Sequence, residues 1–187
     1  DADTTRPGYT NSIDGKYNFE KFFFDEFMPQ IENTYRIRKD KRYRAIAGLS
    51  MGGGGTFVYA MHRPDLFSAA APLSAWMGPT TTDELKGWAE RSGASFDPKD
   101  AEAYLAQYNP LALVKSVEKE KLNSVRWYID CGDDDFLYEG NAQMHVLMRQ
   151  LGVNHEYRVR DGGHTWDYWR TALPTVLEFV SKGFHQF

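Results

Sequence analysis

The stretch that decides the fold is residues 45–55, AIAGLSMGGGG, which precede a helix-like run from Thr56 to His62. The apolar start of this stretch predicts a short strand, and its glycines predict a sharp turn into the helix. Within it, residues 48–52 match the pattern G-x-S-x-G, which holds a serine in a strained turn with its hydroxyl directed outward. The alternative, a glycine-rich turn without chemistry, is disfavoured by the strand and helix on either side. The sequence therefore predicts a strand-turn-helix unit with Ser50 at its turn.

Working outward, strands and helices alternate along the rest of the chain. The further strands are expected at residues 67–74, 125–131 and 156–160, and the further helices around residues 144–151 and 173–180. Residues 76–123 fit this alternation poorly, so we expect an insertion there, with a short helix near residues 101–107. The repeated order favours an α/β fold with a mostly parallel, doubly wound sheet and flanking helices, in one domain over residues 1–187.

The amino-terminal part of the chain reads as a loop of about fifteen residues and then a helix to about Arg36. Asn18 is the expected N-cap, Glu20 lies in the first turn, and Pro29 should kink the helix. An apolar stripe with a spacing of four residues predicts the face that packs on the core. The stripe consists of Phe19, Phe23, Phe27, Ile31 and Tyr35.

Composition excludes several classes of protein. The chain has 187 residues and a formal net charge of −4, without a long block of one sign, so it does not favour nucleic acid or an anionic membrane as a partner. No stretch approaches the roughly 20 apolar residues of a membrane-spanning helix. A single cysteine, Cys131, excludes a framework of internal disulfides. Localisation and oligomeric state stay open.

A serine hydroxyl needs a base and a group that orients the base, and both are expected at the ends of strands. His164 follows two glycines after the last predicted strand, whereas His62, His145, His155 and His185 occupy helix, strand-start or terminal positions. His164 is therefore the predicted base.

Residues 133–135 place three aspartates after the third predicted strand, and any of them could orient the imidazole. A solvated turn and a cation site are alternative interpretations of this run, but a calcium loop would need further acidic residues at fixed spacing. The proposed chemistry requires no metal and no cofactor.

In these segments the chain resembles the esterase D-like α/β-hydrolases, including feruloyl and acetylxylan esterases of carbohydrate esterase family 1. The resemblance extends over nearly the whole chain. It rests on residues 35–36, 44–53, 131–135 and 163–166, with Trp169.

The resemblance implies roles for particular residues. Its G-x-x-D pattern selects Asp135 as the acid, and the backbone N–H of Met51 is the expected oxyanion donor. A second donor is expected from a loop after an earlier strand, so we expect the chain to represent the family domain without its N-terminal part. Such a loss would reduce activity, because one oxyanion donor contributes about 10² to 10³ in turnover.

The predicted function is hydrolysis of carboxylic esters by Ser50, His164 and Asp135 through an acyl-enzyme. Feruloyl or acetyl esters of plant polysaccharide are the favoured substrates, which would imply a secreted or periplasmic enzyme. Trp76, Trp166 and Trp169 are candidate substrate-binding residues. Siderophore esters, S-formylglutathione, acyl transfer to another acceptor, and a non-catalytic carbohydrate-binding or interaction domain are the alternatives.

Overall fold

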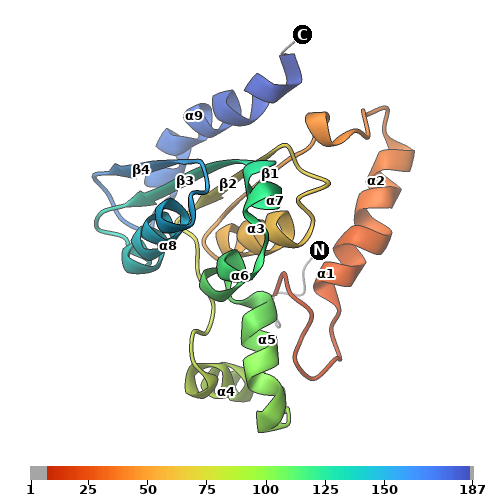
Figure 1. The fold of residues 1–187 in the computed structure, drawn as a ribbon, viewed down its shortest axis with the longest axis vertical. Coiled ribbons are helices and arrows are strands. Elements are labelled where there is room, and N and C mark those ends of the chain that lie inside the picture. The colour runs from red at the N-terminus through yellow and green to blue at the C-terminus, as the bar shows by residue number, and fades with distance from the viewer. Residues whose placement is uncertain (1–7, 186–187) are drawn as a thin grey trace.

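A four-stranded parallel sheet in the order β1-β2-β3-β4 forms the centre of the molecule (Figure 1). The computed structural model describes residues 8–185. The strands are β1 Ala45–Leu49, β2 Ala69–Leu73, β3 Arg126–Gly132 and β4 His155–Arg160. Sequence neighbours are also sheet neighbours, so each connection between strands crosses over and returns in the same direction.

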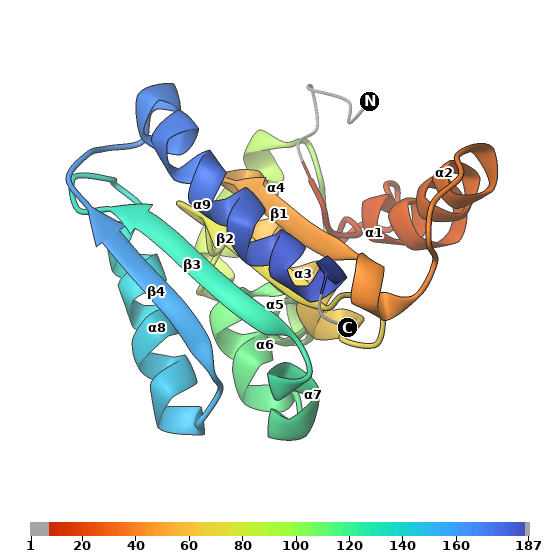
Figure 2. The same ribbon diagram turned by 90° about the horizontal axis from the view of Figure 1, so that it is seen from above.

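Helices cover both faces of this sheet (Figure 2). α3 packs on β1 and β2, α8 packs on β3, and α9 lies against β2 and β3 on the opposite face. None of the helices in the described range 8–185 is long and apolar enough to span a membrane. The α-helices are α1 Phe19–Phe22, α2 Met28–Thr34, α3 Met51–His62, α4 Thr82–Arg91, α5 Ala101–Tyr108, α6 Pro110–Ser116, α7 Lys119–Asn123, α8 Tyr138–Leu151 and α9 Trp166–His185.

Alternation along β3 explains why the sheet has two different faces. Trp127 and Ile129 join the cluster under α3, α6 and α8, which also holds Phe57 and Met144. Tyr128 points the other way, into a smaller cluster under α9. Because side chains alternate across a strand, Asp130, two residues after Tyr128, lies on the α9 face as well. The carboxyl ends of all four strands meet at one edge, where a parallel sheet places its site.

The expected α/β fold with a parallel sheet and helices on both faces is confirmed. The predicted end of α8 is also found, because Gly152 closes this helix in the left-handed conformation at φ 69°. The segment predicted as an insertion, 76–123, contains α4 to α7 between β2 and β3, so it is more helical than the sequence suggested. The expected helix near 101–107 corresponds to α5.

The prediction for the amino-terminal helix was wrong in two respects. Asn18 precedes the helix but its side chain makes no capping hydrogen bond. Phe27 and Tyr35, assigned to the core stripe, are exposed. The backbone is π-helical over Phe23–Phe27, just before Pro29. A π turn holds more residues than an α turn, so a spacing of four no longer keeps one face.

Candidate active site

The turn between β1 and α3 has the strained geometry that the G-x-S-x-G pattern predicts. Ser50 has φ 57° and ψ −119°, a conformation rare for a residue with a side chain. Its backbone N–H donates to the carbonyl of Leu73 at 2.9 Å, and its carbonyl accepts from Trp76 N–H at 2.9 Å. Both bonds fix the turn to the end of β2.

Glycines are required here because the backbone passes close to its neighbours. A Cβ at Gly48 would collide with the carbonyl of Gly52, and one at Gly54 would collide with the carbonyl of Trp76. The glycines therefore let α3 begin directly against the end of β2.

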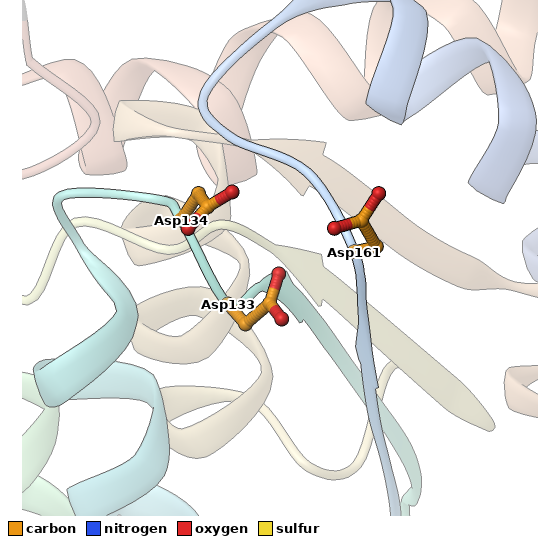
Figure 3. A group of neighbouring side chains, drawn as sticks. All are labelled: Asp133, Asp134 and Asp161. Atoms are coloured by element: carbon orange, nitrogen blue, oxygen red, sulfur yellow. The ribbon is translucent and has the colours of Figure 1, made fainter.

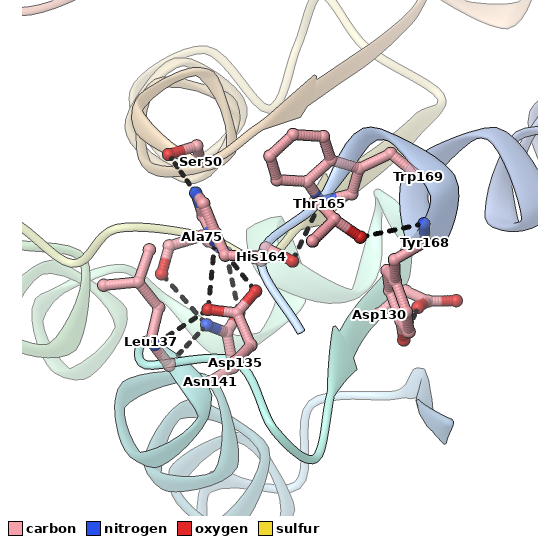
Figure 4. Close-up of polar contacts among 11 residues, drawn as sticks. Ser50, Ala75, Asp130, Asp135, Leu137, Asn141, His164, Thr165, Tyr168 and Trp169 are labelled. Carbon is pink, nitrogen blue, oxygen red and sulfur yellow. Dashed lines mark hydrogen bonds and ion pairs between the residues drawn. The ribbon is translucent and has the colours of Figure 1, made fainter. Parts of the chain in front are cut away.

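Three side chains from three loops meet at this turn (Figure 4). His164 Nε2 lies 2.9 Å from Ser50 Oγ, and His164 Nδ1 lies 2.8 Å and 3.0 Å from the two oxygens of Asp135. An ionised carboxylate only accepts hydrogen bonds, so Nδ1 carries the proton and donates to Asp135. Nε2 is then free to accept the proton of the Ser50 hydroxyl, which is the arrangement that general-base activation needs.

Asp135 is held in place by its own loop. Its side chain is fully buried, and it also accepts from the backbone N–H of Leu137 at 2.8 Å. Asn141 of α8, likewise fully buried, bridges Leu137 and Ala75 through its amide. Sequence reasoning missed Asn141, although its spacing of three and seven from Met144 and Met148 indicates the buried face of α8.

Aromatic rings enclose the imidazole of His164. Phe136 lies on one side with ring centroids 4.6 Å apart, and Trp169 meets the imidazole edge-on at 4.7 Å. Trp169 is buried, whereas Phe136 is 78% exposed and Trp166 is 62% exposed. Phe136 was also missed from the sequence.

Of the three aspartates in the run, Asp135 is the one that pairs with His164 in the described part of the chain. Asp133, Asp134 and Asp161 are exposed, and each offers a carboxylate oxygen within 4.8 Å of the others (Figure 3). Asp133 accepts from the backbone N–H of Gly162 at 3.1 Å, which ties the acid loop to the loop of His164. An exposed acidic group of this kind is common without an ion, and nothing else here indicates a ligand.

Trp76 is the first residue of the segment 76–123, and its backbone is hydrogen-bonded to the turn of Ser50. Its ring is 6.5 Å from that of Trp88 on α4. These indoles, with Arg91 and Phe136, line a recess of about 390 Å³. Phe136, whose ring packs on His164, is part of the wall of this recess, and the charged side chains of Glu84 and Glu139 line it as well.

Met51 is the first residue of α3, so the helix itself leaves its backbone N–H without a partner. This N–H follows Ser50 directly and lies at the positive end of the helix dipole. Cys131 is no competing nucleophile, because burial, followed by the charge of Asp135, raises the pKa of its thiol to about 12.

Comparison with known proteins identifies the family. A family model described as "Putative esterase" matches residues 2–180. The chain belongs to this esterase family. It is 24% identical over 192 residues to an acetyl esterase of Caldicellulosiruptor saccharolyticus, covering 93% of this chain and 68% of the relative. It is 35% identical over 165 residues to an endo-1,4-beta-xylanase/feruloyl esterase of Xylanibacter ruminicola, covering 88% of this chain and 18% of that protein.

Among solved structures, a ferulic acid esterase superposes with a TM-score of 0.80 at 37% identity. The alignment covers 96% of this chain and 65% of that structure. The esterase chain thus spans about two thirds of the acetyl esterase and of the ferulic acid esterase that it matches. These findings bear out the resemblance to esterases of the α/β-hydrolase type.

Proposed function

We propose that this chain hydrolyses carboxylic esters through an acyl-enzyme on Ser50. The observation that carries the proposal is the continuous chain of hydrogen bonds from Ser50 through His164 to Asp135, at 2.9 Å and 2.8 Å. Each member has the chemistry its position needs: a hydroxyl at a strained turn, an imidazole with a free nitrogen, and a buried carboxylate.

The reaction proceeds in two acyl-transfer steps. Ser50 Oγ attacks the ester carbonyl as its proton passes to His164 Nε2, and the N–H of Met51 stabilises the oxyanion. The bond to the alcohol then breaks, and the leaving oxygen takes the proton from His164. Water next gives a proton to His164 and attacks the acyl-enzyme. His164 returns that proton to Ser50 Oγ as the carboxylic acid leaves, while Asp135 stabilises the imidazolium in both steps.

The favoured substrates are feruloyl or acetyl esters of plant polysaccharide. Support comes from the relatives named for feruloyl and acetyl esterase activity. The recess that Phe136 shares with Trp76 and Trp88 offers three aromatic rings to a planar aromatic acyl group. Trp166, exposed at the start of α9, is the candidate platform for a sugar ring.

The test is release of ferulate from methyl ferulate and of acetate from a short acetyl ester, by the parent chain and by Ser50→Ala. Hydrolysis by the parent with loss in Ser50→Ala is the expected result. Faster turnover of the ferulate ester would favour an aromatic acyl group. A folded parent that hydrolyses neither ester, or a Ser50→Ala variant as active as the parent, would contradict the proposal.

A further inference from the structure

The loop that carries His164 is tied at both of its ends to one buried carboxylate. Residues 161–165 connect β4 to α9. Arg160, the last residue of β4, lies with Nη2 2.8 Å from Asp130 Oδ2. Tyr168, in the first turn of α9, donates its hydroxyl to Asp130 Oδ1 at 2.6 Å (Figure 4). Asp130 is fully buried in β3.

The carboxylate of Asp130 is well satisfied. Tyr128 donates to Oδ2 at 2.8 Å and accepts from Arg160 Nη2 at 2.8 Å. Burial, with the hydrogen bond to Asp130, raises the pKa of Tyr128 to about 12 and raises the pKa of Tyr168 as well, so both phenols remain donors near neutral pH. We call Tyr128, Asp130, Arg160 and Tyr168 the Asp130 network.

The ring of Tyr168 supports the loop directly. A Cβ at Gly162 would lie 2.9 Å from Tyr168 Cδ2, and Gly162 has φ 133°, which a side chain would strain. A Cβ at Gly132 would collide with the carbonyl of Gly162 and lie 3.2 Å from Tyr168 Cε2. The loop is therefore confined between the end of β3 and the Tyr168 ring, two residues before His164.

Asp130 also fixes the ring that packs on His164. Its backbone carbonyl accepts from Ser74 N–H at 2.7 Å, and Ser74 is buried with a positive φ of 41°. The Ser74 hydroxyl accepts from Trp169 Nε1 at 3.0 Å. Trp169 in turn meets His164 edge-on at 4.7 Å. Two adjacent residues of α9 are thus anchored through Asp130.

We propose that Asp130 is a positioning residue, which acts through Tyr168 and Trp169 to keep His164 Nε2 within reach of Ser50. The inference rests on the proposed function, since it concerns the base of that reaction. A buried ion pair is in general weak evidence for stability, because desolvation of the charges offsets their attraction. Here the carboxylate contacts Arg160 and Tyr168, which lie at the two ends of the loop of His164. The link to Trp169 runs instead through the backbone carbonyl of Asp130 and Ser74.

The experiment compares Asp130→Asn and Tyr168→Phe with Trp127→Phe. Trp127 lies on the same strand as Asp130 but on the opposite face of the sheet. Its Nε1 donates a buried hydrogen bond to the carbonyl of Leu122 at 2.9 Å. We expect kcat of the two network variants to fall by about 10- to 100-fold with KM within about twofold, because small displacements of a catalytic group are costly. Trp127→Phe should lower the melting temperature without lowering kcat of the folded enzyme. Equal kcat values in Tyr168→Phe and Trp127→Phe would overturn the proposal.

A second readout does not depend on ester hydrolysis. The proton on His164 Nδ1, which is hydrogen-bonded to Asp135, should give a low-field proton NMR signal, and its loss in His164→Ala would assign it. The signal should shift or broaden in Asp130→Asn and Tyr168→Phe and remain in Trp127→Phe. If the parent hydrolyses no ester, the proposed function fails while this measurement still tests the positioning. The same signal in the parent and in all three variants would overturn the positioning role of Asp130.

Discussion

The two faces of the sheet differ in what they bury. Under α3, α6 and α8 the core is apolar, with Phe57, Trp127 and Met144 at its centre. Under α9 the apolar cluster is smaller and adjoins the buried carboxylate of Asp130, which binds Tyr168. The first face accounts for most of the hydrophobic burial. The second face is connected to the loop of His164, so substitutions on the two faces should have different consequences.

The largest effect is expected where the α9 face reaches the chemistry. His164→Ala should lower kcat by about 10⁴- to 10⁶-fold, because the hydroxyl of Ser50 loses its base. The melting temperature should change little, since the imidazole adds little to either core. Steady-state ester hydrolysis and thermal unfolding measure the two quantities. His145→Gln on α8 is the matched control and should keep the parent kcat; a comparable loss there would point to a general effect of histidine removal.

Substitutions on the apolar face should affect stability more than kcat. Met144→Ala removes a fully buried side chain and should lower the free energy of unfolding by about 2–5 kcal/mol. The kcat of the remaining folded enzyme should stay near that of the parent. Urea unfolding gives the first value and active-site titration corrects the second. Leu173→Ala, at an exposed position of α9, should leave stability nearly unchanged. A large fall in kcat of Met144→Ala would contradict the expectation that the apolar face affects stability and not catalysis.

A polar pair at the rim of the apolar face should affect stability in a pH-dependent way. His62 Nδ1 contacts Glu20 Oε1 at 2.6 Å, and Nε2 contacts the carbonyl of Gln107 at 2.9 Å. Burial alone would lower the pKa of His62, but the hydrogen bond and charge of Glu20 outweigh it and raise the pKa. Both nitrogens face acceptors, which favours the imidazolium.

Because the pKa of His62 is raised in the folded state, its protonation contributes to the free energy of unfolding. This contribution is complete below the unfolded pKa of about 6.5 and is lost as pH rises through the folded pKa. Glu20→Gln should therefore lower the melting temperature more at about pH 6 than at about pH 9. The exposed pair of Arg63 and Asp65 offers a control, Asp65→Asn, which should show no such difference. A larger effect of Glu20→Gln at the higher pH would reverse the assigned sign.

The smallest expected effect concerns substrate choice. Phe136→Ala removes an exposed ring between His164 and the recess, and it should lower kcat/KM for methyl ferulate by about 2- to 10-fold more than for an acetyl ester. The ratio between the two substrates cancels any change in His164 itself. An equal loss on both esters would mean that Phe136 acts on the imidazole and not on the acyl group.

The sequence allowed the prediction of those features that follow from local pattern. Ser50 was predicted from its motif between strand and helix, and His164 from its place after the last strand. The choice of Asp135 among three aspartates needed the family resemblance, because local chemistry treats them alike. Asp130 was overlooked because its role depends on Arg160 and Tyr168, which the fold brings to it from another strand and a helix.

The amino-terminal helix is a case in which the local pattern gave a wrong prediction. Its spacing of four residues predicted one buried face, but the π-helical segment Phe23–Phe27 shifts the register. Phe24, outside the predicted stripe, packs on Tyr59 with ring centroids 5.0 Å apart, while Tyr35 is 60% exposed. Periodicity alone does not reveal an extra residue in a turn.

The central claim is that Ser50 is a nucleophile activated by His164. A fluorophosphonate reacts with an activated serine to form a stable adduct, so mass spectrometry of the labelled chain tests the claim directly. We expect one adduct, on the peptide that contains Ser50, formed at a rate that falls by about 10³-fold or more in His164→Ala. A folded chain that forms no adduct, or one that labels equally fast without His164, would contradict it.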